Sequence, residues 1–169
     1  MADIVTVQTL ANAARFLVMR FTDVSDGTGE SGVLKVDATD PANGWVVQGQ
    51  TLVPGTSLKI TKVAYACRGM KLRMQWQATA PEDVLVLGGF NTLEFDDIGV
   101  IQNPGPVALP GATGSILFTT VGAESGDSYS VDLWMTKGIP GAAAEDVLIE
   151  LEDGAGVWLW ESGDAIQWG

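Results

Sequence analysis

Alternating apolar and polar residues give the clearest structural signal in the chain, in the segment SLKITKVAYACRGMKLRMQWQA (residues 57–78). In its second half, large apolar side chains alternate strictly with Lys, Arg and Gln, and its first half places a valine, a tyrosine and Cys67 on one face. A period of two puts one kind of side chain on each face of a β-strand. Because Arg68 and Gly69 stand between the two halves, where a tight turn belongs, the pattern predicts a β-hairpin.

Four further segments carry strand patterns. RFLVMRFTDV (15–24) has apolar side chains on both faces, as in a strand covered from two sides. VLVLGGFNTLEF (84–95) predicts a buried strand with a glycine break, either a bulge or a kink. SILFTTVG (115–122) and SYSVDLWMTK (128–137) predict a second hairpin across AESGD. Glycine and proline are frequent, at 21 and 7 residues, and long helical patterns are missing. We therefore expect an all-β fold, a β-sandwich or jelly-roll-like domain.

The composition changes after Lys137, which is the last basic residue and is followed by seven acidic ones. This change predicts two parts joined by a linker rich in glycine and alanine. We place a β-sandwich domain with an N-terminal arm at residues 1–138, the linker at 139–144, and an acidic, tryptophan-rich extension of short strands at 145–169.

The extension contains an internal repeat. IELEDG (149–154) and WLWESG (158–163) superpose with a step of nine residues, and each alternates large apolar residues before an acid-glycine turn. Strands this short are marginal alone and must pack on a larger surface. Three interpretations stay open: the extension completes an edge of its own sandwich, it pairs with neighbouring subunits, or its tryptophans stack on carbohydrate. In the second interpretation the subunit contacts are Trp158, Trp160 and Trp168.

The chain is strongly acidic. Its 169 residues carry a formal net charge of −12, and the pI is about 4.1. Phosphate contacts require a basic surface, so we expect neither a nucleic-acid partner nor docking on anionic membranes. No apolar run approaches the ~20 residues that cross a bilayer, and no secretory signal is visible, so we expect synthesis in a cytoplasm. A single cysteine excludes an internal disulfide framework.

Histidine is absent, which removes the commonest general base and most transition-metal sites. LEFDDIG offers acids for glycoside hydrolysis, but adjacent carboxylates at a strand end usually serve as turn residues or hydrogen-bond acceptors. We interpret Glu94, Asp96 and Asp97 in that way, and Cys67 as a small hydrophobe of the core. The sequence therefore predicts no enzyme, no catalytic residues and no cofactor.

The sequence offers candidate ligands for one metal ion, calcium. The loop DVSDGTGE and the acids near it supply carboxylate oxygens, but their spacing lacks the regular i, i+2, i+4 pattern of a calcium loop. We therefore expect no bound metal. The candidate ligands are Asp23, Asp26, Glu30 and Asp37.

Basic residues gather in one segment. Five of the nine stand between residues 59 and 73, and no acid occurs from 59 to 77. They form either the solvated outer face of a hairpin or a basic strip complementary to an acidic partner surface. This basic strip consists of Lys59, Lys62, Arg68, Lys71 and Arg73.

Several of these segments together resemble a family of tailed-bacteriophage virion structural proteins. The similarity covers about residues 5–138 and does not include the extension. The matching stretches are RFLVMRFT (15–22), KITKVAY (59–65), WQA (76–78), FDDIGVIQN (95–103) and GDSYSVDLWMTK (126–137).

The resemblance implies a structural role in the virion, after synthesis in the host cytoplasm. We expect most specifically a capsid decoration (cement) protein on the surface of the phage head. Alternatives are a neck, tail or fibre component, or a carbohydrate-binding module for host adsorption. The expected partners are the major capsid protein and further copies of the chain, as a homotrimer or homodimer. We expect the N-terminal arm (2–10) and the basic strip to face the capsid.

Overall fold

The computed structural model of the protein describes residues 4–13, 15–43, 58–95 and 99–137. Strands make up 67% of this part, all of them antiparallel, and it contains almost no helix, so the predicted all-β, sandwich-like fold is confirmed. The elements are β1 (Ile4–Asn12), β2 (Phe16–Asp26), β3 (Val33–Val36), the 3-10 helix η1 (Pro41–Asn43), β4 (Leu58–Trp76), β5 (Glu82–Glu94), β6 (Ile101–Gln102), α1 (Gly105–Ala108), β7 (Ile116–Val121) and β8 (Ser125–Lys137).

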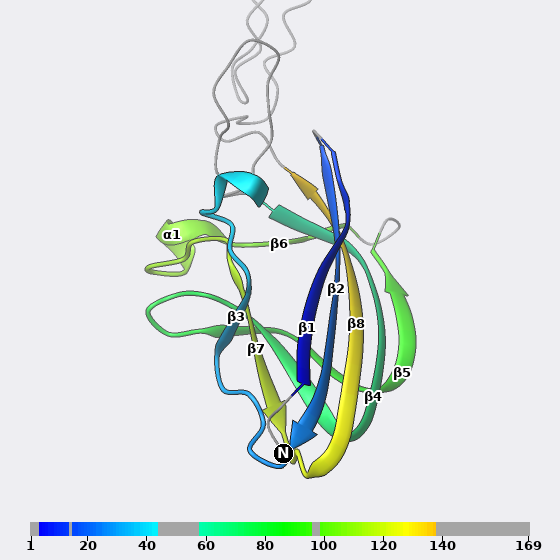
Figure 1. The fold of residues 1–169 in the computed structure, drawn as a ribbon. Helices are drawn as coiled ribbons and strands as arrows, with labels where there is room; N and C mark the ends of the chain where they lie inside the picture. The colour runs from blue at the N-terminus through cyan, green and yellow to red at the C-terminus, as the bar shows by residue number, and fades with distance from the viewer. Residues whose placement is uncertain (1–3, 14, 44–57, 96–98, 138–169) are drawn as a thin grey trace, which may run out of the picture.

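One antiparallel sheet folds on itself until it is nearly closed into a barrel-like shape (Figure 1). Its path is β1-β2-β8-β4-β7-β3, and β5 and β6 also pair with β4. The first half of β4 pairs with β8 and the second half with β7, while β5 follows both halves. We call β1-β2-β8-β4-β5 the first layer and β3-β7-β4-β5 the second layer.

β4 is one strand of 19 residues, so the predicted hairpin across Arg68 and Gly69 is wrong. The strand changes partners at this point, from Ser128 of β8 opposite Arg68 to Val121 of β7 opposite Lys71. Gly69 has a φ of +80°, which lets β4 bend from the first layer into the second. A glycine bend within a strand and a glycine turn between strands share the same local sequence, and the tertiary pairing decides between them.

The second predicted hairpin, between β7 and β8, is also wrong. β7 pairs with the second half of β4 and β8 with the first half, so the two strands follow one another along the same edge of β4. The short segment between them lies beside the bend of β4 and does not form a hairpin turn. The predicted alternation in β8 is confirmed, because one face of the strand is buried: Tyr129, Val131, Leu133 and Met135.

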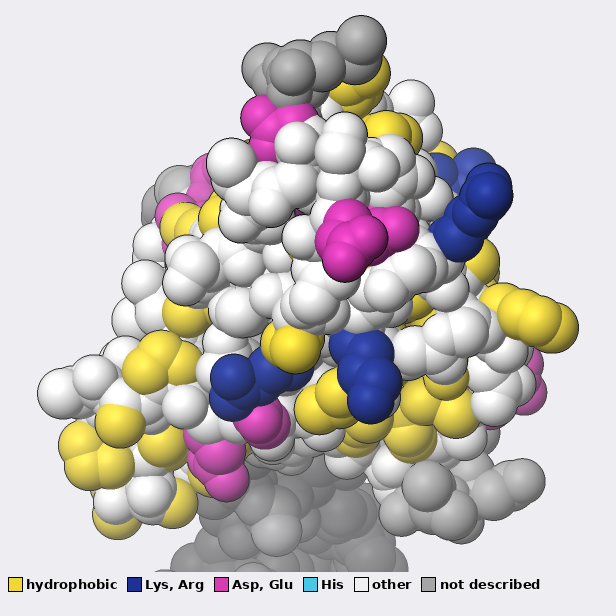
Figure 2. All heavy atoms as spheres, turned by 90° about the horizontal axis from the view of Figure 1, so that it is seen from below, with side chains coloured by type: hydrophobic (Ala, Val, Ile, Leu, Met, Phe, Trp, Pro, Cys, Tyr) yellow, Lys and Arg dark blue, Asp and Glu magenta, His cyan; other side chains and the backbone are white. Residues whose placement is uncertain are grey.

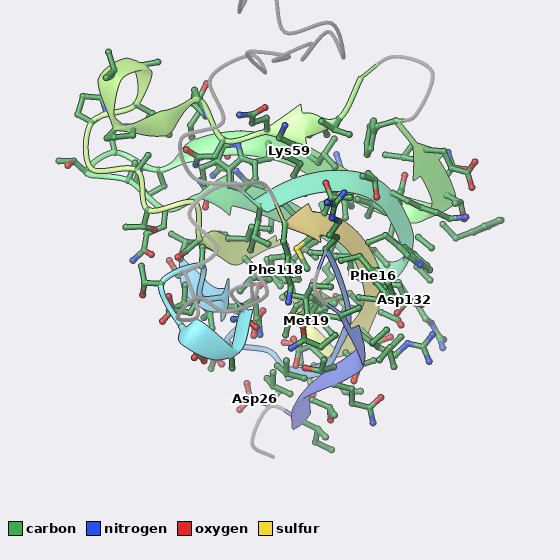
Figure 3. The ribbon with its side chains drawn as sticks, turned by 90° about the horizontal axis from the view of Figure 1, so that it is seen from above. Phe16, Met19, Asp26, Lys59, Phe118 and Asp132 are labelled. Carbon is green, nitrogen blue, oxygen red and sulfur yellow. The ribbon has the colours of Figure 1, made fainter. Side chains whose placement is uncertain are left out.

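The core lies between the two layers. β2 buries every second residue, so the prediction that it is covered on both faces is wrong: Met19 and Phe21 point inwards, whereas Phe16 is 47% exposed. Figure 3 shows Met19 and Phe118 inside the folded sheet. The Phe118 ring meets Phe21 edge-on with ring centres 5.2 Å apart and Tyr129 at 5.9 Å, so aromatic contacts join the layers.

β5 is less buried than its sequence predicts. Leu87 is its one fully buried residue, whereas Val86 and Phe90 are 58% and 87% exposed. The predicted break at the glycines coincides with a register shift against β4: Cys67 pairs with Gly89 and Leu72 with Leu87, so the extra residues lie on β4 and not on β5. Hydrophobic residues on β5 therefore contribute to the surface of the protein as well as to its core.

The predicted N-terminal arm is a strand of the sheet, since residues 4–12 form β1 and pair with β2. The predicted linker (139–144) and extension (145–169), with Trp158, Trp160 and Trp168, lie outside the described residues.

Candidate protein-binding surfaces

β1 is exposed on both of its faces and along one edge. It pairs with β2 on one side, and none of the strands in the described ranges lies against its other edge. Its sequence, IVTVQTLAN, contains no charged residue and no proline. Natural proteins usually protect such an edge with lysine, proline or a covering loop, because its free backbone groups can pair with another strand. Four apolar side chains of β1 are between 44% and 57% exposed: Ile4, Val5, Val7 and Leu10.

The outer face of the first layer has small side chains at its centre. Opposite residues of an antiparallel sheet share a face. The register therefore places Thr22 of β2, Ser130 of β8, Ala66 of β4 and Phe90 of β5 in one row. Two hollows of about 510 and 430 Å³ adjoin this row, and both are lined by Ala66, Phe90 and Ser130. The strongly exposed ring of Phe90 thus lies beside both hollows.

The next row of the same face contains an ion pair. The Arg20 guanidinium donates two hydrogen bonds of 2.6 Å to the Asp132 carboxylate, and these bonds and the charge of Asp132 raise the pKa of Arg20. Asp132 lies on the outer side of β8 (Figure 3) and lines the larger hollow. Arg20 and Asp132 are therefore polar neighbours of the small side chains, and their two charges offset one another.

The bend in β4 divides the predicted basic strip between two faces. Lys59, Lys62 and Arg68 precede the bend and lie in the first layer, whereas Lys71 and Arg73 follow it and lie in the second. Figure 2 views the molecule from below, and on this face the Lys and Arg side chains lie apart, with apolar and acidic side chains between them. The five cations therefore do not form one continuous strip.

Acids of β5 engage two of these cations. Lys62 forms an ion pair with Glu94 and lies 5.2 Å from the centre of the Trp134 ring. Arg73 donates to both carboxylate oxygens of Asp83, with its closest contact at 2.8 Å. Because β4 itself contains no acid, its sequence alone did not reveal these partners.

The predicted carboxylate candidates for catalysis are not brought together in the described structure. Glu94 is held by Lys62, and Asp96 and Asp97 lie outside the described residues. The interpretation of these three residues as turn or hydrogen-bonding residues is therefore supported only for Glu94, which serves in an ion pair.

The four candidate calcium ligands have separate roles in the fold. Asp26 and Asp37 each accept a hydrogen bond from the backbone N–H two residues further on, at 3.0 and 2.8 Å. Hydrogen bonds from Thr39 lower the pKa of Asp37. Asp23 is buried on β2. Glu30 contacts Lys35 and Tyr129. Across the part of the chain that the structure describes, no group of three or more acidic or cysteine side chains could hold a metal ion.

Glu30 belongs to a buried polar cluster that the sequence did not predict. Its carboxylate forms an ion pair with Lys35 and accepts a hydrogen bond of 2.7 Å from the Tyr129 hydroxyl. The Lys35 ammonium lies 5.9 Å from the centre of the Phe118 ring. Burial, followed by the bond to Glu30, raises the pKa of Tyr129 far above its ordinary value. We call Glu30, Lys35 and Tyr129 the buried cluster.

Cys67 is half-buried, packs against the core and lines the smaller hollow. Burial raises the pKa of its thiol, which keeps the reactive thiolate scarce at neutral pH. Its position agrees with a packing role.

The chain matches no family model, no curated protein and no solved structure. No helix within the described ranges is long and apolar enough to cross a membrane. The functional proposal therefore depends on the motif resemblance and on the exposed surfaces.

Proposed function

We propose that the chain is a bacteriophage virion structural protein, most specifically a decoration protein that binds the outer surface of the head shell. The observation that carries the proposal is β1, a nine-residue edge strand with no charged residue and with exposed apolar side chains on both faces. A protein that functions by binding other proteins needs such a surface. The motif resemblance to phage virion proteins supports the virion as the assembly to which it binds.

The chemistry of β1 fits binding by strand addition. An extended segment of the major capsid protein would extend the first layer by one strand, and its main chain would form hydrogen bonds to the open edge of β1. Val5 and Val7 lie opposite buried or inward-facing residues of β2, yet are 44% and 48% exposed. The added strand would cover them and remove apolar area from water.

Binding of this kind stabilises a shell by mass action. A protein that binds assembled capsomers and not free subunits shifts the assembly equilibrium towards the shell. No bond is made or broken in this role, so it requires only complementary surfaces.

β1 is a better candidate for the contact with the shell than the basic strip. The strip is divided by the bend in β4, and Lys62 and Arg73 are already paired with acids of β5. Lys59, Arg68 and Lys71 can add local contacts, but β1 offers a continuous surface.

A neck, tail or fibre component would use the same kind of surface at another place on the particle. Copy number per virion distinguishes the two roles, since a decoration protein covers the whole head and a neck or tail protein occupies a few positions. Quantitative mass spectrometry of purified virions measures this number directly.

The binding test uses Val7→Lys. Lysine on an edge strand opposes strand addition, so we expect affinity for expanded heads that lack the protein to fall by about tenfold or more, measured by cosedimentation. Val107→Lys is the matched control, because it makes the same change at a 98% exposed valine on α1, away from β1. Circular dichroism checks that both variants are folded.

Two results would count against the proposal. Unchanged head binding by Val7→Lys would remove β1 as the contact, and a wild-type chain that binds neither heads nor tails would remove the virion role.

A further inference from the structure

Phe90 is the most exposed aromatic side chain in the described structure, at 87%. It follows Gly88 and Gly89, where the register of β5 shifts against β4, and it lies directly opposite Ala66. The alanine leaves one side of the ring without a tall neighbour. A large apolar ring in this position interacts with water over most of its surface, which is unfavourable unless another molecule covers it.

Phe90 stands between two hollows on the same face. The larger one extends over Ala64 and Thr92 towards Asp132, and the smaller one extends towards Arg68 and Ser128. The hollows have volumes of about 510 and 430 Å³, so each is large enough for a phenyl ring, which would displace water from it. A projecting ring and a space of suitable size are therefore adjacent on one surface.

We propose that the outer face of the first layer is a self-association surface, on which two copies of the chain pair so that the Phe90 of each enters the other's hollow. A two-fold axis brings the same patch of both copies together, so such an interface requires a patch that is complementary to itself. A ring next to a hollow meets this requirement, because the two-fold rotation places the ring of each copy in the hollow of the other.

The charge of this face also favours a second copy as the occupant. Two chains of net charge −12 repel one another, so they must approach where the local charge is small. The sheet register assigns four cations and three acids to the outer face of the first layer, a sum of about +1. The cations are Arg20, Lys59, Lys62 and Arg68, and the acids are Asp26, Glu94 and Asp132.

The size of the face is close to that of a standard dimer interface. Five strands at a spacing of about 4.8 Å, contributing on average roughly nine residues at about 3.3 Å, cover on the order of 700 Å². A standard protein interface buries about 800 Å² per partner. The ion pairs Arg20–Asp132 and Lys62–Glu94 lie in the next two rows beside Ala66 and Phe90, and in each pair the two charges offset one another.

This surface includes the outer face of β1 but not its open edge, and the inference does not depend on where the protein sits in a virion. It adds a contact between copies to the proposed contact with the shell. The test therefore uses the purified full chain in free solution, without phage particles.

The experiment measures the dissociation constant of the dimer by sedimentation equilibrium. We expect a wild-type dimer, and we expect Phe90→Ala to weaken it on the order of 100-fold, because two symmetry-related aromatic anchors are lost at once. Ala66→Gln fills the hollow with a longer uncharged side chain on the exposed face, so it should weaken the dimer while leaving Phe90 in place. Val86→Ala is the control, since it truncates a 58% exposed residue of the same strand in the second layer, and it should leave the dimer unchanged.

Three outcomes would overturn the inference: a wild-type chain that stays monomeric up to about 100 μM, an oligomer that Phe90→Ala does not weaken, or one that Val86→Ala weakens equally. The monomeric chain would then be titrated with soluble oligosaccharides. Binding that Phe90→Ala abolishes would assign the hollow to a sugar ring.

Discussion

Glu30, Lys35 and Tyr129 show how single residues depend on contacts that are remote in sequence. Tyr129 is 99 residues from Glu30 along the chain, yet its hydroxyl donates to the Glu30 carboxylate in the core. A buried ion pair gains attraction in a low dielectric and loses hydration of both charges, so its main requirement is that every partner is present. The cluster therefore ties the loop after β2, β3 and β8 together in one arrangement.

The raised pKa of Tyr129 predicts a loss of stability at alkaline pH. The unfolded chain releases the tyrosine proton near pH 10, while burial and Glu30 keep it bound in the folded chain. Below pH 10 both states hold the proton and the stabilisation is complete. Above pH 10 the unfolded state binds fewer protons, so the free energy of unfolding should fall by up to about 1.4 kcal/mol per pH unit.

Urea unfolding between pH 8 and 11 measures this slope, with Tyr129→Phe as the comparison. The phenylalanine variant loses the hydrogen bond to a charged acceptor, a cost of about 1.5–3 kcal/mol at pH 8, and it should show a shallower decline above pH 10. Equal slopes in the two proteins would contradict the assignment.

β4 is the element around which the fold is organised. It is a member of both layers, and the strands β5, β7 and β8 follow its bend at Gly69. A Cβ added at Gly69 would lie 1.8 Å from the Asp127 carboxylate, which already accepts a hydrogen bond from the Glu124 backbone N–H at 2.8 Å. The bend thus needs glycine for its backbone angle and also for the close approach of the β7–β8 corner.

Gly69→Ala tests this double requirement. We expect a loss of about 2–3 kcal/mol in the free energy of unfolding, from the unfavourable positive φ and from displacement of Asp127. Gly122→Ala is the matched control, because Gly122 also has a positive φ, of +72°, but no atom within 4 Å of an added Cβ. Its cost should be about 1 kcal/mol, and urea unfolding of both variants gives the difference. Equal costs would show that Asp127 moves away freely.

At the scale of the whole molecule, the protein is strongly acidic but has two weakly charged surfaces. β1 has no charged residue, and the outer face of the first layer has nearly balanced charges, within a chain of net charge −12. Such a distribution keeps free copies soluble and directs association to the places where repulsion is smallest. It also leaves the open edge of β1 to the proposed contact with the shell and the outer face of the first layer to the proposed contact between copies.

The salt dependence of head binding follows from this distribution. If the uncharged β1 carries the contact, affinity should change by less than about threefold between 0.05 and 0.5 M NaCl, since screening acts on charged contacts. If the basic strip carried it, affinity should fall steeply over the same range. Cosedimentation with heads at a series of salt concentrations measures the effect, and a steep decline would return the contact to Lys59, Arg68 and Lys71.

The sequence by itself determined the β-class of the fold, the inward faces of β8 and of the second half of β4, and the irregularity of β5 at Gly88 and Gly89. These features follow from side chains that alternate along one strand, which is local information. The sequence predicts β1 only as an N-terminal arm, because the exposure of a strand edge depends on which neighbouring strands are absent.

Only the tertiary structure decided the meaning of Gly69, the order of β7 and β8 along β4, the division of the basic strip and the hollow beside Phe90. Each of these depends on which strands pair, and pairing joins residues that are far apart in the chain. The same glycine permits a turn or a bend, and the same lysine is solvated or paired, according to the strand that the fold places beside it.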